Sequence, residues 1–560
     1  MASACVAFAS PALGQAPEQV VVYGALANSN IGIDPSKLAG SLQSLTAAQI
    51  TANGGATLLD SLGSRTAGVS LSDSQGNGMS QDLRLHGFEA SPLQGTAQGI
   101  AVYQNGMRLN EAFGDTVNWD AIPEAAIARM DIWSNNPVFG LNALGGAINL
   151  TMKTGFDWQG LEASAQGGSY GHGMASLQYG LADGDFAFYA AADGVTDGGW
   201  RLHSASDLAR LYADAGWRLG DSEIHLVASG AQSGLGVVGP TPIELVRQDS
   251  ASVYTWPQNT QNRIVSLALN GKSRLDDDWQ LQASLYLRAF RQRHLDGNDG
   301  NFESCSGRSS FGGKLCLEDD AFGTPPGGKT TSFRDQFVIL GPAGQTFPFN
   351  SGITYGTDDR SATDSVTEGT TLQVTGKSPL SGLANTFTLG GSFDHGAIGF
   401  RSTSSLGRLF ADLQVAPDAA VPGSGLVVHS LGNLGYAPVD LAATTDYYGL
   451  YAVDALDLNA ALTLTAGFRL NSAHIKTRDR SGTASELTGG HGYAHFNPFA
   501  GMSYKITDAL TFFGGYSEAN RAPTPLELDC ASKSLPCLLE GSLVADPPLQ
   551  QVVAHTGEAG

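Results

Sequence analysis

Strict alternation of apolar and polar residues is the feature that most constrains how this chain can fold. From Gln280 to Arg291, one face carries Leu281, Ala283, Leu285, Leu287 and Ala289, and the other carries Gln280, Gln282, Ser284, Tyr286 and Arg288. Successive side chains of a β-strand point to opposite faces, so this segment predicts a strand with one apolar side. Alternation over about ten residues is typical of a strand in a membrane β-barrel.

The spacing of such segments also indicates a barrel. Short turns join three pairs of them: Arg263–Asn270 with Gln280–Arg291, Thr445–Asp454 with Leu462–Leu470, and Pro498–Tyr504 with Leu510–Tyr516. Long polar segments, Leu295–Ser361 and Gly396–Asp440, lie between the pairs. Short turns on one side and long loops on the other favour an outer-membrane barrel over a soluble sandwich or propeller, whose spacing would be more even.

Composition and charge exclude some classes of protein. Hydrophobic residues make up 42% of the 560 residues, but no uninterrupted apolar run comes near the length of a transmembrane helix after the first few positions. The net charge of −22 argues against binding nucleic acid, whose phosphates need a basic surface. It fits an acidic solvated surface, or exposed loops that hold divalent cations.

The N-terminal residues predict export. Residues 1–16 are mostly apolar and small before Pro17, like the later part of a secretory signal peptide. A basic start is missing, so we expect the true start to lie upstream of Met1. Residues 17–35 then form a flexible segment with one β-prone run, Glu18, Gln19, Val20, Val21, Val22 and Tyr23.

Four cysteines outside this region fall into two close pairs, Cys305 with Cys316 and Cys530 with Cys537. Each pair lies in a segment rich in Gly, Ser or Pro with no His nearby, which differs from the usual spacing of zinc ligands. Two local loop disulfides in an oxidising compartment are the prediction, with unpaired thiols as the alternative. We find no motif for a catalytic site, a metal site or a cofactor.

Residues 36–155 differ in pattern from the rest and predict a compact mixed unit. Its expected helices are Leu45–Ile50 and Thr57–Leu62, and its expected strands are Asp82–Leu85, Ile100–Tyr103, Ala128–Trp133 and Gly146–Met152. Asn105-Gly106 favours a tight hairpin turn.

Four segments of this unit, in order, resemble the plug domain of TonB-dependent outer-membrane receptors: Asn53–Leu62, Gln81–Phe88, Gly99–Arg108, and Ile127–Ile132 with Gly140–Leu150. The resemblance implies a mainly β fold, a transmembrane antiparallel β-barrel with an N-terminal α+β plug in its lumen. Residues 36–155 would be the plug and residues 156–560 the barrel. We count roughly fourteen strand candidates of the family's about 22, so we expect a barrel truncated at its C-terminus.

The resemblance also implies roles for individual residues. The run Glu18–Tyr23 resembles the TonB box, an extended segment that can add a strand to a partner's sheet; a plain linker is the alternative. Arg84 and Arg129 match plug arginines that pair with barrel acids, and His86 stands where the family has Arg, so its contact would depend on pH. Aromatic ligand contacts are expected at the plug apex from Phe88, Phe113 and Trp119, with packing as the alternative.

The function implied is active import without covalent chemistry. TonB would be the protein partner, outer-membrane lipid the surroundings, and the outer membrane of a Gram-negative cell the location. A ferric siderophore is the first expectation for the small-molecule ligand, and cobalamin or an oligosaccharide is the second. Haem is less favoured, because no His lies between Arg521 and Leu549. A passive porin or a soluble β-rich binding protein are alternatives of other classes.

Overall fold

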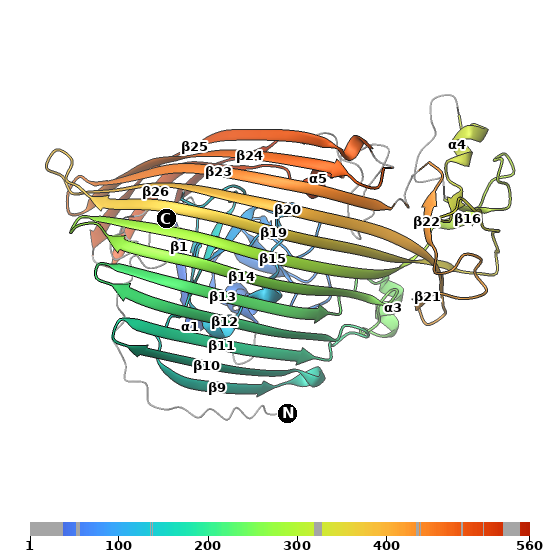
Figure 1. Cartoon of the computed structure of the whole chain (residues 1–560), viewed down its shortest axis with the longest axis horizontal. Helices are drawn as coiled ribbons and strands as arrows, with labels where there is room; N and C mark the ends of the chain where they lie inside the picture. Colours follow the sequence, from blue (N-terminus) through green and yellow to red (C-terminus); the bar gives the residue numbers. More distant parts are fainter. Residues whose placement is uncertain are drawn as a thin grey trace.

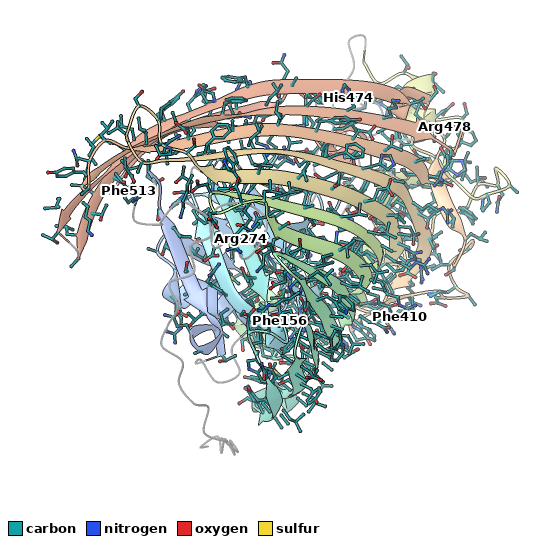
Figure 2. All side chains as sticks on the ribbon, turned by 60° about the vertical axis from the view of Figure 1, so that its left-hand side comes forward. Phe156, Arg274, Phe410, His474, Arg478 and Phe513 are labelled. Carbon is teal, nitrogen blue, oxygen red and sulfur yellow. A yellow bond between two sulfur atoms is a disulfide. The ribbon has the colours of Figure 1, made fainter. Side chains whose placement is uncertain are left out.

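The computed structural model describes residues 37, 39–51, 57–134, 136, 138–318, 328–432, 436, 438–482, 485–507, 509–529 and 549–560. In this part of the chain a large antiparallel sheet, here called the wall, curves around a smaller mixed unit, here called the plug (Figures 1 and 2).

Fourteen strands of the described residues form the wall. They are β9 (Gly160–Gly167), β10 (Gly173–Asp183), β11 (Phe186–Asp197), β12 (Ser206–Leu219), β13 (Ser222–Leu235), β14 (Gln258–Arg274), β15 (Trp279–Asp299), β19 (Tyr355–Lys377), β20 (Asn385–Leu409), β23 (Val439–Asp457), β24 (Leu462–Asp479), β25 (Gly489–Thr507), β26 (Leu510–Arg521) and β27 (Val552–Ala559). Each pairs antiparallel with the next one in this order. The predicted mainly β architecture of a barrel sheet with an inner plug is confirmed.

The two faces of the wall differ as the alternation predicts. On β15, Gln282, Tyr286 and Arg288 are buried against the plug side, whereas Leu285 and Leu287 are exposed on the outside. The strands run further than predicted, because β15 continues to Asp299 and β19 begins at Tyr355, both inside the expected loop. Near their ends these strands carry polar residues on both faces, so the apolar face that marks the strand in the sequence is lost there.

The two ends of the wall have different connections (Figure 1). Short turns join the strands at one end, here called the turn end. The other end, the loop end, carries α3 (Ile243–Gln248), α4 (Thr331–Asp335), α5 (Pro525–Asp529), β16 (Phe302–Ser304), β17 (Leu315–Leu317), β18 (Ile339–Leu340), β21 (Val415–Ala416), β22 (Val427–Ser430), η4 (Ser169–Gly171) and η6 (Ser485–Leu487). Among the described residues, no helix has the length and apolarity needed to cross a membrane.

The plug has two sheets. Its elements are β1 (Leu42–Thr46), α1 (Ala47–Thr51), α2 (Leu58–Arg65), β2 (Val69–Ser72), β3 (Asp82–Leu85), β4 (Phe88–Ala90), β5 (Ile100–Gln104), β6 (Met107–Arg108), η2 (Trp119–Ala121), η3 (Glu124–Ala126), β7 (Ile127–Trp133) and β8 (Gly146–Met152). The larger sheet has the order β1-β7-β8-β5-β6, and the smaller has the order β2-β3-β4.

Local sequence explains most of these plug elements. Helix α2 begins after Thr57, whose hydroxyl accepts a hydrogen bond from the Asp60 amide while the Asp60 carboxylate accepts one from the Thr57 amide, a capping box. The helix expected at Leu45–Ile50 is instead divided: Leu45 belongs to strand β1, which pairs with β7, and α1 starts only at Ala47. Pairing with a distant strand overrides the local helical preference there.

Candidate functional site: the junction of plug and wall

The plug is fixed to the wall by a buried arginine. Arg210 on β12 is 2% exposed; its Nη1 lies 3.0 Å from Oε1 of Glu124 on the plug, and its Nε lies 2.6 Å from Oδ2 of Asp193 on β11. One wall cation thus neutralises an acid from each side of the junction. A buried charge is stable only when it is paired, so the pair ties the position of the plug to the wall.

Two acids of the plug are held by neutral donors of the wall. Asp120 accepts hydrogen bonds from the Ser233 hydroxyl at 2.5 Å and the Asn262 amide at 3.1 Å. Glu111 accepts one from the Ser365 hydroxyl at 2.8 Å. Burial raises the pKa of both carboxyl groups, although these hydrogen bonds oppose the shift.

A polar contact also links the plug to the end of strand β26. Asp115 accepts from Arg108 Nη2 at 2.7 Å and from the Asn142 amide at 2.9 Å. The Asn142 side-chain oxygen accepts from the Ala522 amide at 3.1 Å, and the Asn142 backbone amide donates to the Asn520 carbonyl at 3.0 Å. The side chains of Arg108, Asp115 and Asn142 are buried. Their hydrogen bonds therefore connect the interior of the plug to the wall.

The arginines that the sequence assigned to barrel contacts make their ion pairs inside the plug. Arg84 Nε lies 3.5 Å from Glu89, its neighbour across β3 and β4, and Arg129 Nε lies 2.9 Å from Asp131 on its own strand. His86 is an exposed turn residue with φ 52° and no barrel partner among the described contacts. The ion pairs described for Arg84 and Arg129 are thus with acids of the plug, and their contacts with barrel acids stay a prediction.

The three aromatic residues expected at a ligand apex all make packing contacts. Phe113 is fully buried and stacks on Phe400 of the wall with ring centroids 4.6 Å apart. Trp119 is 3% exposed and donates from its indole nitrogen to the Ala90 carbonyl at 3.2 Å. Phe88 is half-buried and packs against the plug core. These contacts agree with the alternative of packing, and a role in ligand binding stays a prediction for the three residues.

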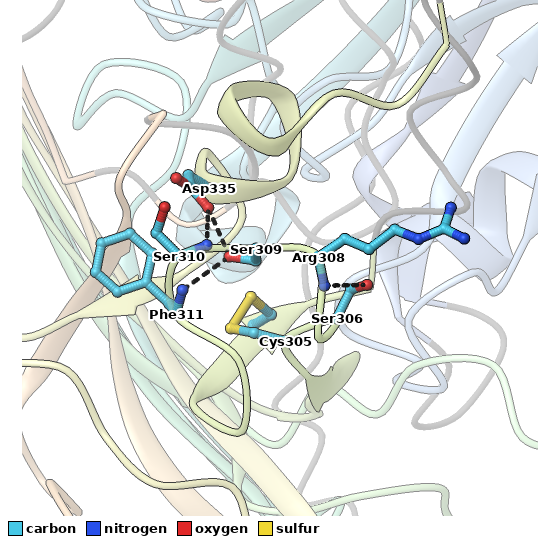
Figure 3. Close-up of a disulfide and its surroundings, with 8 residues drawn as sticks. Cys305, Ser306, Arg308, Ser309, Ser310, Phe311 and Asp335 are labelled. Atoms are coloured by element: carbon cyan, nitrogen blue, oxygen red, sulfur yellow. Dashed lines mark hydrogen bonds between the residues drawn. A yellow bond between two sulfur atoms is a disulfide. The ribbon is translucent and has the colours of Figure 1, made fainter.

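A folded body of loop residues lies at the loop end, here called the loop body: residues 300–318, 328–354 and 410–432. It has its own buried core, which includes Phe337, Val338, Ile339 and Val428. A disulfide joins Cys305 to Cys316, and Asp335 accepts from the Ser309 hydroxyl at 2.6 Å beside it (Figure 3). These contacts give the loops a fixed shape over the loop end.

Other residues of the prediction cannot be placed. Glu18–Tyr23 and the pair Cys530 and Cys537 lie outside the described residues. Within the residues that the structure does describe, no group of three or more His, Cys, Asp or Glu side chains is suited to holding a metal ion.

Sequence reasoning missed the contacts that do join the plug to the wall. Arg210, Asp120 and Glu111 lie in segments without any motif that we recognised. One pattern could have marked them: Glu111, Asp115, Asp120 and Glu124 place four acids in fourteen residues of an otherwise mainly apolar segment. Acids at such density in a unit that must be enclosed predict partners on the enclosing sheet.

Comparison with protein families gives two matches. Residues 34–147 match the TonB-dependent receptor plug domain, and residues 228–560 match the TonB-dependent receptor-like β-barrel. No curated protein matches the sequence.

Solved structures share the fold at low sequence identity. The ferric citrate transporter FecA in its unliganded form has a TM-score of 0.64 at 13% identity, over 87% of this chain and 64% of that chain. The siderophore receptor PiuA from Acinetobacter baumannii has a TM-score of 0.62 at 14% identity, over 91% and 68%. The copper transporter OprC has a TM-score of 0.57 at 15% identity, over 92% and 66%.

The present chain thus spans about two thirds of the length of these proteins, and 64% of the first. Its barrel match covers more than half of its 560 residues and comes after the plug match, which is the family's order. The chain belongs to the family of TonB-dependent receptors.

Proposed function

We propose that this receptor imports a ferric siderophore across the outer membrane of a Gram-negative cell, with TonB as the partner that supplies the energy. The single observation that carries the proposal is the plug held inside the wall by buried polar contacts. A passive porin needs an open lumen, whereas Arg210, Asp120 and Glu111 fasten a folded unit within it.

The outer face of the wall supports a location in lipid. Its exposed large side chains are mainly leucines: Leu177, Leu211, Leu226, Leu267, Leu285, Leu372, Leu389, Leu450 and Leu470. A soluble protein would hide such a surface, because apolar area exposed to water is costly. Lipid tails cover it without that cost.

Active import needs a way to move the plug, and the contacts at the junction are suited to being broken and remade. They are hydrogen bonds and ion pairs between separate side chains. No covalent link joins plug and wall among the described residues apart from the chain itself. Pulling on the segment that contains Glu18–Tyr23 would load these contacts from the N-terminal side of the plug.

The ligand class follows from resemblance to siderophore receptors and is tested by growth. A strain lacking the receptor gene should lose growth on at least one ferric siderophore as the only iron source, and the intact gene should restore it. Normal growth of the deletion strain on every siderophore would contradict this ligand class. The next ligands to test for uptake would then be ferric citrate, copper, cobalamin and oligosaccharides.

The role of TonB needs a separate experiment. Deleting Glu18–Tyr23 from the full-length receptor should abolish uptake while the protein still reaches the outer membrane in normal amount. Replacing the same six residues with a Gly/Ser segment of equal length controls for tether length and should also abolish uptake. Uptake that survives both changes would favour a passive channel.

A further inference from the structure

A carboxylate stands on the apolar outer face of the wall. Glu368 is an exposed residue of β19 and lies between Thr367 and Gly369, which are buried. Because the buried residues face the lumen, the Glu368 side chain points outward. The same outward face of the strand carries Val366 and Leu372, which are 47% and 54% exposed. An acid among exposed apolar residues is unusual on a surface that faces lipid.

Glu368 lies within the apolar part of this face rather than at its border. Toward the loop end, the next charged residue on the outward face of β19 is Asp364, which pairs with Arg291 at 2.7 Å. Asp364 is separated from Glu368 by about 13 Å along the strand. The apolar band of a membrane barrel is about 25 Å tall. The Glu368 carboxylate therefore faces the hydrocarbon of the membrane, on the turn-end side of the polar border.

The neighbouring strands offer Glu368 no lysine or arginine. The residues directly opposite it on β15 and β20 are Leu287 and His395. The Nδ1 atom of His395 lies 2.7 Å from Oδ1 of Asp446 on β23, so this imidazole already has an acidic partner. In the described part of the chain, Glu368 takes part in no ion pair. A carboxylate that faces lipid without a cation is costly, and a cation from outside the chain would remove that cost.

A hollow opens beside Glu368 on the same outer face. Its volume is about 480 Å³, and among the described residues that line it Glu368 alone is charged. Leucines of three adjacent strands form most of the lining: Leu226 on β13, Leu267 and Leu269 on β14, and Leu285 and Leu287 on β15. Pockets for small ligands usually have volumes of about 300–1,000 Å³, apolar walls and a few polar groups that fix the orientation of the ligand. The hollow has all three properties.

The pairing of the strands places the carboxylate near one side of the hollow. Leu267, Leu287 and Glu368 lie directly opposite one another on β14, β15 and β19. Leu269 and Leu285 are paired in the adjacent outward-facing row, toward the turn end. An elongated ligand that lies across these strands would therefore contact leucines along most of its length and Glu368 near one end.

We propose that this hollow binds a small amphiphile with a protonated amine, whose ammonium group pairs with Glu368 while its apolar body covers the leucines. The inference rests on the proposed function only in placing the wall in lipid. A hydrogen bond between an ammonium group and a carboxylate is stronger than one between neutral groups, and lipid screens it little. A neutral alcohol would leave the carboxylate without a cation, and an anionic amphiphile would be repelled by it.

Photolabelling in membranes tests the site. The full-length receptor is reconstituted in phosphatidylcholine vesicles and labelled with a long-chain primary amine that has a photoreactive group in its chain. Mass spectrometry should locate the label on the peptides that contain Leu226, Leu267 and Leu285. The N-acetylated form of the same probe, which has no charge, should label these peptides about tenfold less. Equal labelling by both probes would overturn the proposal.

A variant at position 368 tests the role of the charge. Glu368→Gln removes the charge and keeps the size of the side chain, so it should lower labelling by the amine about tenfold. Labelling by the acetylated probe should not change. Glu244→Gln, which removes an exposed acid of α3 outside the lining of the hollow, is the matched control and should label like the wild type. An equal loss in both variants, or no loss in Glu368→Gln, would overturn the assignment. Heat-modifiable mobility on a gel shows that each variant has folded.

A second pair of variants tests the hollow itself. Leu267→Trp fills part of the hollow and keeps Glu368, so it should lower labelling by the amine. Leu177→Trp makes the same change at an exposed leucine of β10 outside the hollow and should have no effect. Undiminished labelling of the Leu267→Trp variant would mean that the amine does not occupy the hollow, and the proposal would be wrong.

Competition distinguishes two sources of the ammonium group. Dodecylamine, a single-chain amine, and phosphatidylethanolamine, a membrane lipid, are each added to the labelling reaction of the wild type at the same mole fraction. Competition by dodecylamine alone supports a small amphiphile as the ligand. Equal competition by phosphatidylethanolamine would overturn the small amphiphile in favour of a membrane lipid. Failure of dodecylamine to compete would overturn the site.

Growth of the same strains on ferric siderophores separates this inference from the proposed import. A Glu368→Gln receptor that loses labelling but still imports iron supports the amine site and leaves import standing. A wild-type receptor that is labelled as expected but imports no siderophore supports the amine site and refutes the proposed ligand class of the importer.

Discussion

Nη1 of Arg210, a wall residue, lies 3.0 Å from Oε1 of Glu124, a plug residue, at the buried junction between them. The same guanidinium also contacts Asp193 at 2.6 Å. The wall arginine therefore has two acidic partners, and only one of them leaves if the plug moves. Removal of Arg210 and removal of Glu124 should therefore change the free energy of unfolding by different amounts.

Substitutions at the two ends of this contact should differ in cost. Arg210→Gln leaves both Glu124 and Asp193 buried without a cation, and we expect a loss of about 3–5 kcal/mol in the free energy of unfolding. Glu124→Gln should cost less, because Asp193 still balances Arg210. Urea unfolding of the detergent-folded receptor measures both. Arg360→Gln, an exposed arginine, is the control, and a loss at Arg210 as small as at Arg360 would contradict the docking role.

The stability of the docked plug should depend on pH through Glu111 and Asp120. Burial raises the pKa of both groups from their ordinary values of 4.5 and 3.8, so the folded state binds protons more tightly than the unfolded state. Between the ordinary and the raised pKa values, the free energy of unfolding should fall as pH rises. The stabilisation from Glu111 and Asp120 is complete at pH values below their ordinary pKa values. It is lost at pH values above their raised pKa values in the folded state.

Unfolding measured across this range in the wild type and in the double variant Glu111→Gln/Asp120→Asn isolates the effect. The variant should show a weaker fall of stability with rising pH, because its amides do not titrate. Identical pH profiles for the two proteins would mean that these carboxyl groups do not control docking.

The disulfide should stabilise the loop body alone. Cys305 and Cys316 are 11 residues apart in sequence, and the bond restricts the unfolded loop. Cys305→Ser should cost about 2–3 kcal/mol within the loop body and speed its cleavage by protease. The unfolding midpoint of the wall should not change. Ser310→Ala, in the same loop, is the control, and equal protease resistance of the two variants would contradict the prediction.

Substitutions at Phe113 can distinguish a role in packing from a role in ligand binding. Its ring stacks on Phe400 in a fully buried position, so Phe113→Ala should lower the free energy of unfolding by about 3–5 kcal/mol. Phe113→Leu should cost clearly less, since it fills most of the space. If instead the alanine variant loses ligand affinity while its unfolding midpoint stays normal, Phe113 is a ligand contact.

Gly146 is required by the backbone of the plug sheet. Its φ is +131°, and a Cβ atom there would lie 2.2 Å from the Trp133 carbonyl oxygen across the β7–β8 ladder. We expect Gly146→Ala to lower the free energy of unfolding by at least about 3 kcal/mol. Gly78→Ala, where the added atom meets nothing within 4 Å, should have little effect. Similar unfolding midpoints for both variants would contradict this explanation.

The sequence predicts the strands of the wall well because each must present an apolar face outward. Leu285 and Leu287 are exposed on the outer face of the wall and Tyr286 and Arg288 are buried, as their alternation requires. The strand ends were missed, since near Asp299 the outward face meets no apolar surroundings. A polar residue there carries no information about which face it occupies.

The contacts at the junction were much harder to predict. Whether Arg84 meets Glu89 or a wall acid depends on which plug strand lies beside it and on the curvature of the wall. Ser233 and Asn262 reach Asp120 from positions 113 and 142 residues away. Single serines and asparagines on lumen-facing positions look alike in sequence, and only the assembled fold selects the ones that meet an acid.

The acids of the plug and the donors of the wall have a consequence for recombination between receptors. Glu124 requires a cation at position 210, and Asp120 requires donors at positions 233 and 262. A plug exchanged into a foreign barrel would carry buried carboxylates to walls without matching groups. Plug and barrel of this receptor should therefore be inherited together, and a functional chimaera should need the three wall positions transplanted with the plug.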